Sequence, residues 1–172
     1  MDFENRYVCD RKLYMEFTRN VLFRKLNSYS LFLFIVVVCL ISTEALNGDV
    51  SQLSIVLALF TLLIPIISVY TGRKSFKNAK KFCNGEIPEC IVYFGETIRY
   101  TEGKTNSEID YSKVTHILNL KNIYVVQCAK AASFIVAKGK FSFGKEEDFV
   151  GFIRNKCPHA KYLKHRYRKK EL

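Results

Sequence analysis

The sequence lacks the short motifs of the common catalytic families. It has no P-loop, no G-x-G-x-x-G, no G-x-S-x-G and no H-E-x-x-H. Histidine is scarce, and none of His116, His159 and His165 has a cysteine or carboxylate at metal-site or catalytic-triad spacing. The sequence therefore predicts a protein that is not an enzyme, and we expect no cofactor.

The cysteines also lack a recognisable pattern. The chain has six, but no C-x-x-C pair and no cysteine and histidine spacing of the zinc-site kind. Cys39 lies in an apolar run, and the others fall in segments that we expect to face the cytoplasm, where thiols stay reduced. We therefore expect neither a metal site nor a structural disulfide.

Acidic residues are too few to balance the basic ones, and the excess is local. Residues 82–157 carry ten basic and nine acidic groups, whereas residues 73–81 carry five basic groups and no acidic one. The last fifteen residues, 158–172, carry six against one. An excess of basic residues beside the apolar blocks and in the tail indicates that the partner is an anionic membrane surface. It argues against nucleic acid as the partner.

Two apolar blocks, at about 28–46 and 53–72, predict a transmembrane helical hairpin over 28–72. The second has no charge in twenty residues, about the length that crosses a hydrocarbon core of roughly 30 Å. Its Pro65 predicts a kink that membrane helices tolerate. A cleaved signal peptide is the alternative for the first block, but the long, partly acidic segment before it opposes that interpretation.

The flanking charges predict the orientation of the hairpin. Lys and Arg precede the first block and follow the second, while the loop between them holds only Glu44 and Asp49. Cations favour the side that is not translocated, so we expect two spans in the cell membrane, the inner membrane of a bacterium, with both termini in the cytoplasm. We expect Glu44, near one end of its span, to be a solvated interfacial carboxylate.

The segments that flank the hairpin carry their own signals. Residues 1–27 predict a strand at Phe3–Val8 and an amphipathic helix with Asp10 as its N-cap, lying either on the membrane surface or against the later domain. Residues 73–89 predict a basic juxtamembrane helix that ends near Gly85.

Residues 90–157 predict a small α+β domain. Period-two patterns with turn residues between them indicate an antiparallel sheet, and an amphipathic helix with acidic residues at its start and basic residues at its end follows, before Pro158. The most economical arrangement is a partial barrel with the helix over one open end. The predicted strands are Cys90–Phe94, Thr97–Thr101, Glu108–Tyr111, Val114–Leu120, Ile123–Cys128 and Phe134–Lys138.

The chain resembles the YcxB-like family of small bacterial membrane proteins. The resemblance covers nearly all of it except the tail, and is carried by I-x-Y-S-K-V around Ile109–Val114, K-N-x-Y-V-V at Lys121–Val126 and the V-A-K-G-x-F run before an E-D-F helix. The opening strand, D-x-x-x-Y at Asp10–Tyr14 and helix are similar too. The resemblance implies two transmembrane helices and a pleckstrin-homology-like (PH-like) cytoplasmic domain, and it assigns no activity to any residue.

Two clusters of cations are candidates for contact with anionic lipid. One follows the second apolar block, where each cation near the surface contributes about 1 kcal/mol. The other is the tail, which could also grip RNA or be a solvated end. The candidates are Arg73, Lys74, Lys77, Lys80, Lys81, Lys161, Lys164, Arg166, Arg168, Lys169 and Lys170.

The functional prediction is a non-enzymatic, membrane-anchored regulatory or scaffold protein. Its partners would be the bilayer, anionic headgroups and an unknown protein, or a second copy of the chain. The alternatives are an immunity protein against a membrane-active toxin and an accessory subunit of a transporter. No residue in the sequence separates these roles, so the interpretation rests on the charge map and the missing catalytic motifs.

Overall fold

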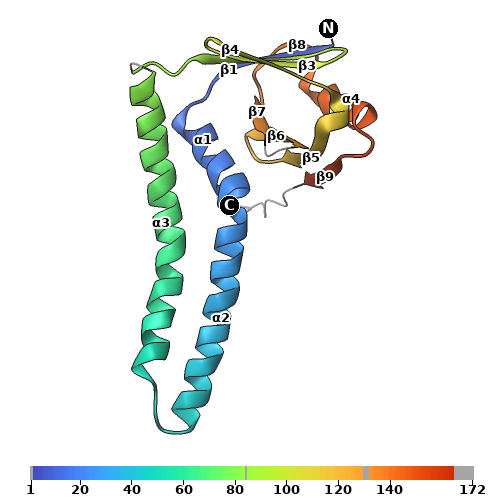
Figure 1. Ribbon diagram of the computed structural model, residues 1–172. Coiled ribbons are helices and arrows are strands. Elements are labelled where there is room, and N and C mark those ends of the chain that lie inside the picture. Colours follow the sequence, from blue (N-terminus) through green and yellow to red (C-terminus); the bar gives the residue numbers. More distant parts are fainter. Residues whose placement is uncertain (1, 84, 130–131, 165–172) are drawn as a thin grey trace, which may run out of the picture. The chain divides into compact units, whose positions relative to one another are not determined.

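The computed structural model describes residues 2–83, 85–129 and 132–164, which divide into two compact units (Figure 1). One unit is helical and comprises Thr18–Ala79. The other joins the residues up to Phe17 with those from Lys80 onward. The helical unit is therefore an insertion in the chain of the second unit, and we describe each by itself.

The helical unit contains both of the predicted apolar helices. They are α2 (Arg24–Leu46) and α3 (Gln52–Phe82), and each is long and apolar enough to cross a membrane. The basic helix predicted at 73–89 forms the last part of α3, which continues without a break from the apolar segment through the five cations and ends at Phe82. Beyond the helix, the Gly85 N–H donates to the Lys80 carbonyl oxygen at 2.9 Å, and the φ of +91° at Gly85 suits a helix end.

Small hydroxyl residues form the contact between α2 and α3. Ser54, Thr61 and Ser68 lie seven residues apart on α3 and are buried. The Ser30 hydroxyl donates to the Thr61 carbonyl oxygen at 2.6 Å, and the Ser68 hydroxyl donates to Asn27 Oδ1 at 3.1 Å. A seven-residue repeat keeps one face of each helix toward the other, and small residues let the backbones approach closely.

Glu44 joins the two helices at the hairpin turn. Its Oε2 accepts hydrogen bonds from the Ser51 backbone N–H at 3.0 Å and from the Ser54 hydroxyl at 2.7 Å. Glu44 is half-exposed, so these hydrogen bonds add to the solvated position that was predicted for it. Ser51 is the residue just before α3, so the negative charge of Glu44 lies at the N-terminal end of this helix, which favours it.

Among its described residues the second unit has two sheets, two α-helices that lie wholly within it and a 3-10 turn at Tyr111–Lys113. The five-stranded sheet has the order β4-β3-β2-β1-β8, and the four-stranded sheet has the order β7-β6-β5-β9. The first sheet comprises β1 (Phe3–Val8), β2 (Glu89–Phe94), β3 (Ile98–Glu102), β4 (Thr105–Ile109) and β8 (Phe141–Phe143), and the second β5 (Val114–Asn119), β6 (Ile123–Cys128), β7 (Ser133–Ala137) and β9 (Lys161–Lys164). The helices are α1 (Arg11–Phe17) and α4 (Glu146–Lys156).

The α+β class is confirmed, but the predicted limits of the domain, 90–157, are not those of the compact unit. These limits leave out β1, which pairs with β2 along its whole length, from Phe3 opposite Phe94 to Val8 opposite Glu89. They also leave out β9, which pairs with β5 in parallel, so that the second sheet is mixed. Both strands lie far in sequence from their partners, and periodicity does not report such pairings.

Most strand bounds agree with the prediction within a residue or two, and β1 and β6 match it. The exception is β4, predicted at Glu108–Tyr111, which begins at Thr105 and ends at Ile109. The turn before it contains only Gly103 and Lys104, with Gly103 at a φ of +57°. A two-residue hairpin turn of this kind requires positive φ, which glycine adopts without strain.

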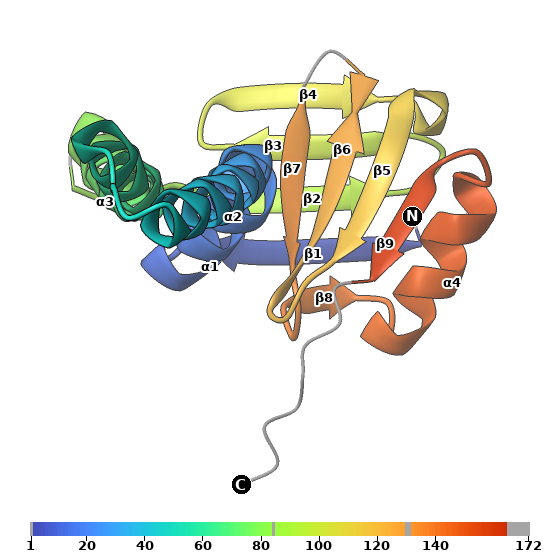
Figure 2. The ribbon, with the colours of Figure 1, turned by 90° about the horizontal axis from the view of Figure 1, so that it is seen from below.

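The strands of the two sheets cross at a steep angle in Figure 2, and α4 closes one end. Inward side chains such as Val92, Val125 and Val136 are fully buried between the sheets. Phe149 of α4 is also fully buried, and its ring centroid lies 4.9 Å from that of Phe94 and 5.4 Å from that of Tyr124. Burying an aromatic ring of this size contributes about 1.5–3 kcal/mol.

The helix predicted after Asp10 is shorter than expected and packs on the sheet unit. Asp10 is its N-cap, since Asp10 Oδ1 accepts from the Leu13 N–H at 2.8 Å, and α1 then gives way at Thr18–Leu22 to a π-helical turn. Glu16 is 9% exposed and accepts from both the backbone N–H and the side-chain amide of Asn122, at 3.1 and 2.5 Å. Of the two predicted positions for this helix, packing against the domain is the one found for α1.

Candidate functional site

The five cations at the end of α3 form one continuous surface, which we call the basic arc. The arc comprises Arg73, Lys74, Lys77, Lys80 and Lys81, all of them exposed. At 3.6 residues per turn these positions fall within about 120° of the helix circumference. The sequence reasoning predicted all five as lipid contacts, and the continuous helix brings them onto a single face.

The basic arc points away from the contact with α2. The buried residues of α3 are Ser54, Thr61, Ser68 and Gly72, and their direction on the helix is about 160° from the centre of the arc. Phe82, at the end of the helix, is 91% exposed. The arc is therefore not used in packing the hairpin and is available to an anionic partner.

The tail cations are described only in part. Lys161 lies exposed on β9, and the backbone of Lys164 ends that strand, whereas Arg166, Arg168, Lys169 and Lys170 lie outside the described residues. The first part of the predicted basic tail is thus an edge strand of the second sheet. Tyr162 and Leu163, an aromatic and an apolar residue among cations, are the sequence signal that could have indicated it.

Side chains from β5 and α4 hold the side chain of Tyr162 in place. Its hydroxyl accepts from the Asn119 side-chain amide at 2.8 Å, and the Arg154 guanidinium carbon lies 3.8 Å from the centre of its ring. A cation over an aromatic face contributes about 0.5–1 kcal/mol at an exposed site. Sequence reasoning missed this site because it combines the tail with β5 and α4.

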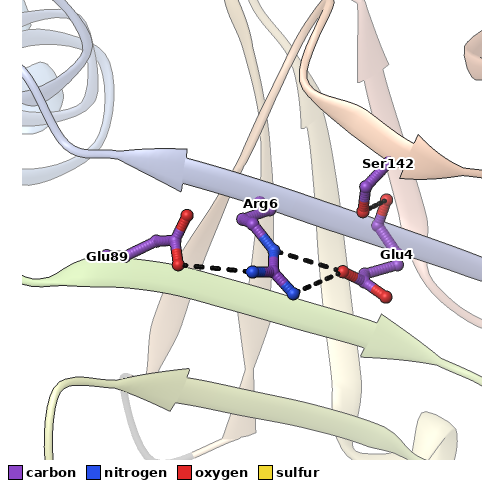
Figure 3. Close-up of polar contacts among 4 residues, drawn as sticks. All are labelled: Glu4, Arg6, Glu89 and Ser142. Atoms are coloured by element: carbon purple, nitrogen blue, oxygen red, sulfur yellow. Dashed lines mark hydrogen bonds and ion pairs between the residues drawn. The ribbon is translucent and has the colours of Figure 1, made fainter.

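The outer face of the five-stranded sheet carries charges of both signs. Figure 3 shows Arg6 between Glu4 and Glu89, with Nη2 3.2 Å from Glu4 Oε1 and Nη1 3.7 Å from Glu89 Oε2. The hydrogen bond to Glu4, followed by the charge of Glu89, raises the pKa of Arg6. In the same view the Ser142 hydroxyl donates to the Glu4 carbonyl oxygen at 3.4 Å. Because Arg6 is paired with carboxylates, this part of the face is a poor site for anions.

A shallow depression lies further along the same face. Two adjoining hollows of about 350 and 420 Å³ share Tyr93, Arg99 and Glu108, which are opposite one another on β2, β3 and β4. The Arg99 guanidinium lies 5.8 Å from the centre of the Tyr93 ring, and the Thr97 hydroxyl donates to Glu108 at 2.5 Å. The hollows are half open and combine the cation Arg99 with the carboxylates Glu96 and Glu108, an arrangement that selects no single class of ligand.

The thiols of the sheet unit are poorly suited to nucleophilic chemistry. Burial, with a smaller effect of Cys90, raises the pKa of Cys9 to about 12, and burial raises the pKa of Cys157 to about 11. Burial also raises the pKa of Cys128. The thiolate is the reactive form, so these cysteines are largely inert at neutral pH.

No metal site is found among the residues that the structure describes, which bring together no group of three histidine, cysteine or acidic side chains able to hold a metal. His116 Nδ1 lies 3.1 Å from the Thr115 hydroxyl on an exposed part of β5, and His159 is exposed. These positions give neither residue the partners that acid and base catalysis requires.

The chain matches no family model, no curated protein and no solved structure.

Proposed function

We propose that this chain is a membrane-anchored regulatory or scaffold protein without enzymatic activity. In this proposal α2 and α3 cross the cell membrane as a hairpin, both termini lie in the cytoplasm, and the sheet unit binds a protein partner at the membrane surface. The basic arc contacts anionic lipid headgroups. The observation that carries the proposal is the continuity of α3, in which an apolar segment of membrane-spanning length leads directly into five cations on one face.

The spacing along α3 supports a headgroup contact. Residues 53–72 span about 30 Å, the thickness of a hydrocarbon core, and residues 73–81 rise about 12 Å beyond it. The headgroup layer and a Debye length of about 8 Å cover this distance. The arc thus lies where anionic lipid attracts cations at about 1 kcal/mol each.

The architecture of the sheet unit supports a PH-like fold and a place in the YcxB-like family. A four-stranded antiparallel meander, β1 to β4, is followed by a three-stranded one, β5 to β7, and then by α4 over one end. These two meanders and the helix that follows them support the PH-like domain that the resemblance implies. The hairpin lies between β1 and β2 in the chain, and β8 and β9 extend the two sheets.

Lipid selection by the basic arc can be tested by native mass spectrometry. The full-length protein would be released from detergent with equal amounts of phosphatidylglycerol and phosphatidylcholine. We expect retained phosphatidylglycerol to exceed phosphatidylcholine several-fold, and the excess to fall as salt rises. Replacing Lys74, Lys77, Lys80 and Lys81 together by glutamine should abolish the preference.

A matched control variant removes the same number of positive charges from the sheet unit instead of from the basic arc. It replaces the exposed lysines Lys104, Lys113, Lys140 and Lys145 by glutamine, and the preference should survive. Equal retention of the two lipids by the wild-type protein, or equal losses in the two variants, would remove the basic arc as the lipid contact.

A further inference from the structure

We propose that the edge of β5 beside α4 is a binding site for an extended segment of a partner protein, with a tyrosine flanked by acidic residues, and that residues 161–164 fill this site as an internal competitor. The inference deepens the protein-partner part of the proposed function and rests on it, but it is independent of the lipid contact.

The backbone of β5 supplies the first part of the site. β9 is added to its outer edge in parallel, with Ile117 opposite Tyr162 and Leu118 opposite Leu163, whereas every other pairing in the described sheets is antiparallel. Figure 2 shows β9 between β5 and α4. An edge strand presents unpaired N–H and C=O groups, which an extended segment satisfies whatever its source.

Asn119 and Arg154 form the part of the site that recognises the tyrosine side chain. They come from different elements, β5 and α4, and meet on Tyr162, at its hydroxyl and over its ring. Phenylalanine would lose the hydrogen bond from Asn119, and an aliphatic residue would lose the ring contact with Arg154 as well. The arrangement therefore favours tyrosine at this position.

Lys138 holds the Asn119 amide in the orientation that this contact needs. Lys138 Nζ donates to Asn119 Oδ1 at 2.6 Å and to the Leu120 carbonyl oxygen at 2.5 Å, and it lies 4.5 Å from the centre of the Tyr124 ring. Since Oδ1 accepts from Lys138, the Nδ2 donor is directed to Tyr162. Lys138, which follows β7, thus orients the Asn119 amide independently of the tail.

The tail is held weakly enough to be exchanged. β9 has four residues, Lys161 is exposed and Leu163 is 38% exposed, so little apolar surface is buried. Each backbone hydrogen bond contributes only about 0.5–1.5 kcal/mol net. The main advantage of the tail is its covalent link through residues 157–160, which acts as an effective concentration of the order of millimolar.

Charge identifies the better occupant. Arg154 lies over the Tyr162 ring and Lys138 binds the Asn119 amide, yet the tail has lysines at both end positions of β9, Lys161 in register with His116 and Lys164 in register with Asn119. A segment with acidic residues at those two positions would match the charge of Arg154 better than the basic tail does. The partner is therefore an acidic, tyrosine-bearing segment rather than a second copy of the basic tail.

Fluorescent peptides test the site on the full-length protein in detergent without anionic lipid. One peptide has the tail sequence P-H-A-K-Y-L-K, the second has glutamate in place of both lysines, and the third also has alanine in place of tyrosine. We expect the acidic tyrosine peptide to bind Tyr162→Ala at least tenfold more tightly than it binds wild type. It should also bind more tightly than the other two peptides.

Two further variants locate the binding. Tyr93→Ala, on the outer face of the other sheet, should bind like wild type, and adding Asn119→Ala to Tyr162→Ala should remove the gain. Hydrogen exchange serves as the control for folding: β6 and β7 should stay protected in Tyr162→Ala, while the β5 amides that face β9 lose protection.

Three results would overturn the inference. They are equal peptide binding by wild type and Tyr162→Ala, binding that survives loss of Asn119, and dimerisation of Tyr162→Ala in place of peptide binding. None of them affects the lipid preference of the basic arc, so failure here and failure of the lipid contact are distinguishable.

Discussion

Val8 and Glu89 face each other at one end of the β1–β2 pair, although the whole helical hairpin separates them in the chain. Neighbouring antiparallel strands are commonly joined by a short turn. Here the connection runs through α1, α2 and α3 instead. Because β1 lies inside the five-stranded sheet, the sheet is complete only when the segments before and after the hairpin meet. Such a distant pairing is slow to form and depends on closure of the hairpin.

Asn5 gives a prediction about pH. It is fully buried in β1, and its side-chain amide mimics a strand by donating to the Ala137 carbonyl oxygen at 2.8 Å and accepting from the Ala137 N–H at 2.9 Å. In Asn5→Asp a protonated carboxyl group can make both bonds, but a carboxylate cannot donate. Burial should hold the pKa of this new carboxyl group well above its unfolded value of about 3.9.

The stability of Asn5→Asp should therefore fall as pH rises. A raised folded-state pKa gives stability that is present below the unfolded pKa and is lost above it, at up to about 1.4 kcal/mol per pH unit. Thermal unfolding in detergent should show a loss of about 2–3 kcal/mol relative to wild type between pH 5 and pH 7. Asn106→Asp, at an exposed position of β4, is the matched control. Parallel pH profiles for the two variants would contradict the prediction.

Glu16 and Asn122 should be energetically coupled. Removing the Glu16 carboxylate leaves the buried end of α1 without its bonds to the β5–β6 turn, so Glu16→Ala should cost about 1.5–3 kcal/mol. Asn122→Ala should cost less, because the backbone N–H can still donate to Glu16. A double-mutant cycle on full-length protein measures the coupling, which we expect at about 1 kcal/mol or more. Additive effects would mean that the two groups stabilise the protein independently.

Alanine substitutions at Gly144 and Gly139 distinguish the stability cost of steric crowding from the cost of an unfavourable backbone conformation. Both have positive φ, +81° and +70°, but a Cβ on Gly144 would meet Phe3 Cδ1 and Cε1, whereas nothing lies within 4 Å of one on Gly139. Gly139→Ala should cost about 1 kcal/mol for the backbone alone. Gly144→Ala should cost a further 1–3 kcal/mol, roughly, for crowding the core. Denaturant unfolding of both variants measures the difference, and equal losses would show that Phe3 and the Asp2 carbonyl oxygen, which the new Cβ would also meet, move away without cost.

Cys9 and Cys157 should resist alkylation in the folded protein. Burial raises the pKa of these thiols to about 12 and about 11, so at pH 8 the thiolate fraction is far below that of an unfolded cysteine, whose pKa is about 8.5. With iodoacetamide we expect the buried Cys157 to react at least 100-fold more slowly, roughly, than the half-buried Cys83, and Cys9, which is also half-buried, to be slowed through its raised pKa. All three should react alike in guanidinium chloride. Fast labelling of Cys157 in the native protein would contradict its burial.

The raised pKa values of these thiols also predict a lower free energy of unfolding at alkaline pH. A thiol with a raised folded-state pKa contributes stability below its unfolded value of about 8.5, and the contribution is lost as pH rises toward the folded value. The midpoint of thermal unfolding should therefore fall above pH 9. Replacing Cys157 by serine should make this fall shallower, and an unchanged slope would exclude the Cys157 thiol as a cause.

Local sequence patterns predict the structure correctly where residues close together in the chain determine it. Asp10 as an N-cap, the strand Phe3–Val8 and the helix before Pro158 depend on residues within one or two turns of each other. The error at β4 was also local, because Gly103 allows a turn shorter than the polar run 102–106 suggested. The basic arc was predicted as a set of residues, and its single face follows only once α3 is known to be unbroken.

The sequence by itself determined the two long apolar helices, the uneven charge, the alternating strands and the absence of catalytic motifs, because each of these depends on composition or on a short period. Only the tertiary structure decided that β1 pairs with β2 across the hairpin, that Glu44 closes the hairpin turn, that Glu16 holds Asn122 and that Tyr162 meets Asn119 and Arg154. These contacts join segments distant in the chain, and their free energy comes from burial and hydrogen bonding that no local pattern records.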